Sequence, residues 1–125
     1  MSRTLLLIGI GGFIGTIARY LLQQLIQKNF PTSFPLGTFW INIIGCFIIG
    51  IVYGLSEKGN LLTPEWRLFL ATGICGGFTT FSSFAFENIS LLRESDYFYA
   101  ALYTGGSVFG GIIAAFLGNF FIKLF

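Results

Sequence analysis

The residues best suited to chemistry lie in one short stretch, residues 76–84, with the sequence GGFTTFSSF inside a long apolar run. Gly and Thr are weak helix formers, and unwound backbone in a membrane is tolerated only where it is buried in protein or lines a water-filled cavity. We predict that a membrane helix is interrupted here. The carbonyl groups freed around Gly76 and Thr79 would suit a hard monovalent cation. An ordinary glycine-rich packing face is the alternative.

The same stretch carries Phe81 and Phe84, which are three residues apart and share one face of a helix. An aromatic ring has a positive edge and a negative face, so paired ring edges can line a path for an anion and disfavour a cation. Phenylalanines at helical spacing are more often simple packing residues. The hypothesis of an anion path therefore needs support from other segments.

Two stripes of hydrogen-bonding side chains supply that support. Thr38 and Asn42 are four residues apart, as are Tyr103 and Ser107, and each pair lies in an apolar segment. Asn42 can also be explained as an interhelical hydrogen bond, and that alternative stays open. Donor stripes and aromatic edges together favour a small, strongly hydrated anion over a cation.

Ionisable residues inside a membrane segment are costly and are candidates for function, which singles out Arg19 and Glu87. The chain has no His, and we find no nucleophile and base pair, so we do not expect an enzyme. Cys46 and Cys75 lack CxxC spacing, which leaves too few ligands for a transition-metal site.

The composition indicates the class of protein whose fold must hold these residues in place. Of 125 residues, 54% are hydrophobic and 10% are charged, and the mean hydropathy is +0.81, which is typical of an integral membrane protein. A spanning helix needs about 20 residues, so we expect four spans in a single transmembrane domain, residues 1–125. The net charge is only +2 with scattered basic residues, which argues against nucleic-acid binding.

We expect the spans at residues 4–27, 37–55, 63–92 and 97–122. The third should begin with Thr63 as N-cap, Pro64 in the first helical position and Glu65 in the first turn. Each span has glycines four residues apart that let helices approach closely, namely Gly11 with Gly15, Gly50 with Gly54, Gly73 with Gly77, and Gly106 with Gly110. The charge difference between the two membrane faces is small, which permits insertion in both orientations.

Three segments in this order carry a family resemblance: GGFIGTIARY, PLGTFWINIIGCFIIG and GICGGFTTFSSF. On these motifs the chain resembles the Fluc (CrcB) fluoride channels over essentially its whole length. The resemblance implies an all-α integral membrane protein with four transmembrane helices per subunit, the third broken at its centre. It further implies an antiparallel dual-topology homodimer with two fluoride pathways and a structural sodium ion, Na+, at the dimer interface.

The resemblance also implies roles for individual residues. The backbone carbonyls of Gly76 and Thr79 match the sodium site, Glu87 lies near the pore, and Arg19 lines a vestibule or forms a structural ion pair. The polar track departs from the family pattern at Gly111, where a hydroxyl can stand. The fluoride pathway is matched by Phe81, Phe84, Asn42, Thr38, Thr80, Ser83, Tyr103 and Ser107.

The predicted function is passive, fluoride-selective export across a plasma membrane, in contact with lipid. One alternative is a small four-helix multidrug-type exporter, but such a protein needs an acidic residue in the first span, where this chain has only Arg19. The other is a structural or assembly membrane protein, in which the polar cluster would hold helices together.

Overall fold

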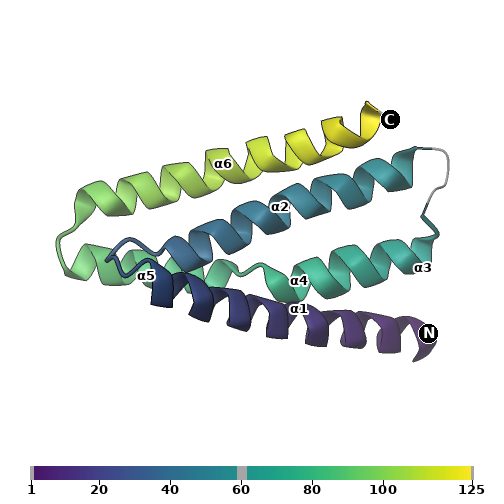
Figure 1. Ribbon diagram of the computed structural model, residues 1–125, viewed down its shortest axis with the longest axis horizontal. Coiled ribbons are helices and arrows are strands. Elements are labelled where there is room, and N and C mark those ends of the chain that lie inside the picture. Colours follow the sequence, from purple (N-terminus) through teal and green to yellow (C-terminus); the bar gives the residue numbers. More distant parts are fainter. Residues whose placement is uncertain (1, 59–61, 125) are drawn as a thin grey trace.

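In the computed structural model, which describes residues 2–58 and 62–124, the described residues form helices joined by short loops (Figure 1). Four helical segments are long and apolar enough to cross a membrane, which confirms the predicted all-α architecture with four spans. The first is α1 (Ser2–Asn29), the second is α2 (Leu36–Glu57) and the fourth is α6 (Tyr97–Lys123). The third span, Pro64–Arg93, consists of α3 (Pro64–Arg67), η1 (Leu68–Cys75), α4 (Gly76–Phe78) and α5 (Phe81–Arg93).

The four spans alternate in direction, and the described ends of the chain lie at the same end of the bundle (Figure 1). α2 packs along α6, while α1 packs along η1 and α4. α1 and α2 therefore flank the middle of the third span, the region that the sequence singles out.

The third span begins as predicted. Thr63 accepts a hydrogen bond from the Trp66 amide at 3.3 Å, Pro64 is the first helical residue, and Glu65 lies in the first turn. A Thr side chain in this position satisfies an amide that has no partner within the helix. The predicted N-cap is confirmed.

The predicted interruption of the third span is also confirmed, and it lies at Thr79 and Thr80. Both have extended backbone, with φ −87° and ψ 157° for Thr79 and φ −150° and ψ 124° for Thr80. Gly76 stays helical, with φ −62° and ψ −39°. The helix before the break widens into the π-helix η1, which the sequence did not predict. The interruption thus begins after the two glycines.

The spaced glycines of the other spans allow neighbouring helices to touch through their backbones. A Cβ at Gly15 of α1 would collide with the Ile74 carbonyl, and one at Gly50 of α2 would collide with the Ala115 carbonyl. Close backbone approach of this kind replaces the hydrophobic drive that helices lack in lipid. These contacts hold α1 and α2 firmly against their neighbours on both sides of the bundle.

Gly15 and Gly9 provide a matched test, since both lie in α1 but nothing lies within 4 Å of a Cβ at Gly9. Gly15→Ala should lower the unfolding free energy in detergent by about 1–3 kcal/mol because the methyl overpacks against Ile74. Gly9→Ala should be neutral or stabilising, since Ala is the better helix former. Denaturation followed by circular dichroism measures both. Equal stability of the two variants would contradict the close contact.

Candidate functional site

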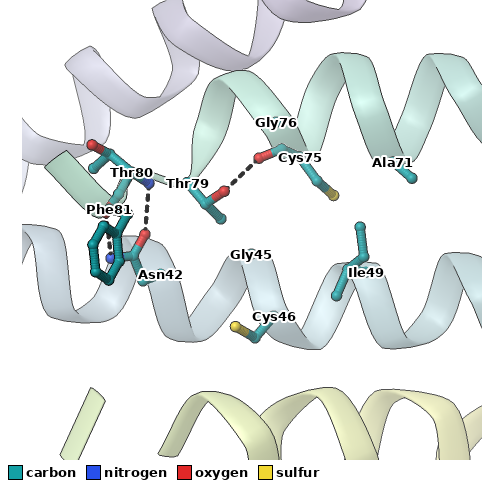
Figure 2. Close-up of a pocket in the computed structure, with 10 residues that line it drawn as sticks. All are labelled: Asn42, Gly45, Cys46, Ile49, Ala71, Cys75, Gly76, Thr79, Thr80 and Phe81. Atoms are coloured by element: carbon teal, nitrogen blue, oxygen red, sulfur yellow. Dashed lines mark hydrogen bonds between the residues drawn. The ribbon is translucent and has the colours of Figure 1, made fainter. Parts of the chain in front are cut away.

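One side chain holds the backbone of the break. Asn42 accepts a hydrogen bond from the Thr80 amide through Oδ1 at 2.9 Å and donates one to the Thr80 carbonyl through Nδ2, also at 2.9 Å. Figure 2 shows Asn42 reaching from α2 to the extended segment. A backbone group without a partner is costly in an apolar environment. Asn42 therefore stabilises the extended conformation of Thr80 by satisfying both of its backbone polar groups.

The break also diverts hydrogen bonds away from two carbonyls. In an uninterrupted helix the Thr80 amide would donate to the Gly76 carbonyl and the Ser83 amide to the Thr79 carbonyl. Here the Thr80 amide donates to Asn42, and the Ser83 amide donates to the Thr80 hydroxyl at 3.2 Å. The carbonyls of Gly76 and Thr79 thus lose their helical donors. These are the two carbonyls that the sequence assigned to a cation.

Gly76 and Thr79 line a cavity of about 330 Å³ between α2 and the third span. Its remaining lining residues are Asn42, Gly45, Cys46, Ile49, Ala71, Cys75, Thr80 and Phe81 (Figure 2). The Thr79 hydroxyl is turned back onto the helix, where it donates to the Cys75 carbonyl at 2.8 Å. Within residues 2–58 and 62–124, no cluster of three His, Cys, Asp or Glu side chains offers an alternative metal site. The groups at the break that could bind a metal ion are therefore neutral carbonyl oxygens, which suit a monovalent cation.

Arg19 contacts the break from the opposite side. Its Nε donates to the Gly77 carbonyl at 3.0 Å, and its side chain is half-buried. The one ion pair in the described part of the chain joins Arg3 to Glu65, so the partner of Arg19 is a carbonyl and not a carboxylate. The sequence left two roles open for Arg19, lining a vestibule or forming an ion pair. It did not predict the contact with the Gly77 carbonyl.

Phe81 and Phe84 follow the break as neighbouring rings. Their centroids are 5.6 Å apart, and Phe84 lies 4.9 Å from the ring of Tyr103. Phe81 is 78% exposed in the single chain, whereas Phe84 is partly buried against Tyr103. The rings form a continuous row from the break to α6, with Phe81 as its open end.

A polar cluster lies beyond that row. The Glu87 carboxyl accepts hydrogen bonds from the Thr38 hydroxyl at 3.1 Å and from the Tyr103 hydroxyl at 2.9 Å. Gln23 of α1 extends the cluster by donating to the Thr38 hydroxyl at 3.3 Å. The structure thus brings Thr38, Glu87 and Tyr103 together. Sequence reasoning missed Gln23, although its place one helical turn after Arg19 was the available signal.

The cluster connects to the end of the bundle. Glu87 lines a cavity of about 260 Å³ together with the connection between α1 and α2, residues 30–35, which exposes Thr32 and partly exposes Phe34. The row of rings and the polar cluster thus lead from the break toward a cavity near a helix end.

The remaining predicted residues are Ser107, Thr80, Ser83 and Gly111. The Ser107 hydroxyl, one turn after Tyr103, is buried and has no hydrogen-bond partner among the described residues, which is uncommon for a buried hydroxyl. Thr80 and Ser83 form the N-cap contact of α5. Gly111 is buried, and a Cβ there would lie 3.2 Å from the Cys46 sulfur. Gly111 therefore packs against α2 and brings no polar group to the row.

These features define a small multi-pass helical membrane protein with a polar site inside the bundle. The family model for the CrcB-like protein, Camphor Resistance (CrcB), matches residues 6–119. The match covers nearly the whole chain, including the break and all of the candidate site residues. The chain belongs to the CrcB-like family, which confirms the resemblance inferred from its motifs.

Curated relatives are similar along almost their full length. A "Fluoride-specific ion channel FluC" of Chlorobium phaeobacteroides (strain DSM 266) is 51% identical over 119 residues, which cover 95% of this chain and 92% of the relative. A protein of the same name from Gloeothece citriformis is also 51% identical over 119 residues, or 95% of this chain and 96% of the relative. A third protein of this name, from Leptospira interrogans, is 46% identical over 124 residues, which cover 99% of this chain and 98% of the relative.

The hydrogen bonds of the polar cluster predict that removal of the Tyr103 hydroxyl has a large effect on stability. Tyr103→Phe should lower the unfolding free energy by about 1–3 kcal/mol, because a Glu87 oxygen loses its donor inside the bundle. Tyr99→Phe is the matched control, since the ring of Tyr99 packs on Phe34 and no contact of its hydroxyl is found in the described residues. It should change stability by less than about 0.5 kcal/mol. Thermal unfolding in detergent measures both, and equal losses would refute the assignment.

Proposed function

We propose that the protein is a fluoride-selective ion channel. The observation that carries the proposal is that two relatives named fluoride-specific ion channels are 51% identical to this chain over 119 aligned residues, which cover 95% of its length. The site supports it, because the chain combines a helix break, a row of aromatic rings and buried hydrogen-bond donors. Fluoride is a small anion that holds its water strongly, so a path for it must replace water with donors.

The pathway proceeds from the break along the rings to the polar cluster. Edges of Phe81 and Phe84 present positive potential to an anion. Ser107 offers a buried hydroxyl that has no hydrogen-bond partner in the part of the chain that the structure describes. The hydroxyls of Thr38 and Tyr103 lie next along the row, where both donate to Glu87. Because a hydroxyl has one O–H, each must turn away from the carboxyl in order to donate to fluoride. We assign Asn42, Thr80 and Ser83 to the entrance of this path at the break.

The functional unit in this proposal is an antiparallel homodimer with two pathways. Phe81 is 78% exposed beside the cavity at the break, so a second subunit would cover it. The small charge difference between the membrane faces suits subunits in opposite orientations. The carbonyls of Gly76 and Thr79 from both subunits would then hold a sodium ion at the interface, which supplies positive charge where the two chains meet.

Export requires no energy source other than the membrane potential. In an acidic environment HF crosses the plasma membrane, dissociates in the more alkaline cytoplasm and leaves as fluoride. A potential that is negative inside contributes about 2.3 kcal/mol per 100 mV to the exit of each anion. The channel thereby confers resistance to fluoride.

Ion efflux from liposomes tests the function. Purified protein reconstituted into vesicles loaded with fluoride and chloride should release fluoride but not chloride, as measured with ion-selective electrodes. Protein-free vesicles give the background. Release of both ions at equal rates, or no release of fluoride, would refute the proposal.

The two rings give a sharper prediction. Phe81→Ile and Phe84→Ile should each reduce fluoride efflux at least tenfold, because Ile has similar bulk but no positive ring edge. Phe98→Ile is the control, since Phe98 is exposed in the first turn of α6 and lies outside the row. It should conduct like wild type. Undiminished flux through the Phe81 and Phe84 variants would show that the rings serve packing only.

Sodium depletion tests the cation site. Reconstitution with a large organic cation in place of sodium should weaken the dimer, because carbonyls that face one another across the interface would lack their counter-charge. Chemical cross-linking before and after the addition of sodium reports the dimer independently of flux. A dimer that persists under rigorous depletion would contradict the site.

A further inference from the structure

The break in the third span is not imposed by the local sequence. Residues 76–84 contain no proline, and Gly or Thr weakens a helix by no more than about 1 kcal/mol per residue. The segments on both sides, α4 and α5, are helical. An uninterrupted third helix is therefore a competing conformation, and contacts from other helices must favour the broken one.

Carbonyls at the break lose their helical donors in different ways. Those of Gly76 and Thr79 remain without the diverted amides, as described above. In an uninterrupted helix the Gly77 carbonyl would accept from the Phe81 amide. In the structure it accepts from Arg19 Nε at 3.0 Å. Among the carbonyls of Gly76, Gly77 and Thr79, that of Gly77 is thus the one that receives a replacement donor within the described residues, and Arg19 supplies it.

Arg19 can reach this carbonyl because α1 lies unusually close to α4. A Cβ at Gly77 would lie 2.6 Å from the Gly12 carbonyl oxygen and 3.0 Å from the Thr16 hydroxyl. Arg19 follows Thr16 by three residues and so lies on the same face of α1. The guanidinium charge also lies at the C-terminal end of a helical stretch, where carbonyl dipoles favour a cation.

We infer that Arg19 is a positioning residue that, together with Asn42, keeps the third span broken. Its Nε–H bond to Gly77 favours the broken over the continuous helix. The broken helix in turn leaves the Gly76 carbonyl without the Thr80 amide and places Phe81, which is 78% exposed, at the start of a new helix. The consequence for the cation site rests on the proposed function, whereas the conformation of the break does not.

Two substitutions separate the donor from the charge. In Arg19→Gln the amide Nε2 stands at the same position along the side chain as Nε of arginine, which keeps an N–H donor without the charge. In Arg19→Met a methyl group stands there. Lys28→Met removes a cation from the same helix at its last turn and serves as control.

The direct readout is the backbone conformation of Thr79 and Thr80 from their ¹³C chemical shifts in bilayers. We expect extended shifts in wild type, Arg19→Gln and Lys28→Met. In Arg19→Met they should move toward helical values or split between two states, since loss of a charged hydrogen bond shifts such an equilibrium roughly tenfold or more. Fluoride efflux and sodium-dependent dimer formation should fall in the same order, with Arg19→Met lowest.

Two outcomes would overturn the inference. Extended shifts in all variants would show that the break persists without Arg19. Equal shifts in Arg19→Gln and Arg19→Met would assign the effect to charge and not to the hydrogen bond. If Arg19→Met does not fold, the dipolar coupling between Arg19 ¹⁵Nε and the Gly77 carbonyl ¹³C in wild type decides, because its absence refutes the contact. These shifts are informative even if the protein conducts no fluoride.

Discussion

Backbone polar groups in the apolar interior of a membrane need hydrogen-bond partners. Thr79 and Thr80, the two extended residues of the third span, are the place where this requirement shapes the structure most directly. Asn42 pairs with both backbone groups of Thr80. Arg19 pairs with the Gly77 carbonyl on the other side of the third span. The break is thus a structure built by three helices. The cavity, the freed carbonyls and the position of the aromatic rings all follow from it.

Close packing makes these long-range contacts possible. Gly15 brings the backbone of α1 against Ile74, and Gly45 brings α2 against Thr79, the residue before Thr80. The absence of side chains at such positions allows polar groups from α1 and α2 to reach the middle of the third span. A glycine that a sequence reading assigns to packing, such as Gly15, therefore has an indirect part in the site. Packing and function are linked through the distance between helices.

The spans and the Thr63 N-cap could be predicted because they depend on local composition and hydropathy, and the weak helix formers at residues 76–80 indicated where the third span could be interrupted. The partners of the break could not be predicted, because Asn42 and Arg19 are 38 and 58 residues away from the groups they contact. A sequence shows that such a side chain is costly in a membrane but not which group it pairs with. Gln23 was missed for the same reason. The family resemblance supplied candidate residues, and the structure supplied their hydrogen bonds.

In the proposed channel, conduction depends on the conformation that two hydrogen bonds between Asn42 and Thr80 hold, one donated by Asn42 Nδ2 and one by the Thr80 amide. The most direct measurement is the rate of fluoride efflux through Asn42→Leu, in which a side chain of similar size forms neither bond. We expect a folded protein whose efflux is reduced about tenfold or more, since each lost hydrogen bond contributes on the order of 1 kcal/mol. Efflux at the wild-type rate through that variant would show that conduction does not require these hydrogen bonds.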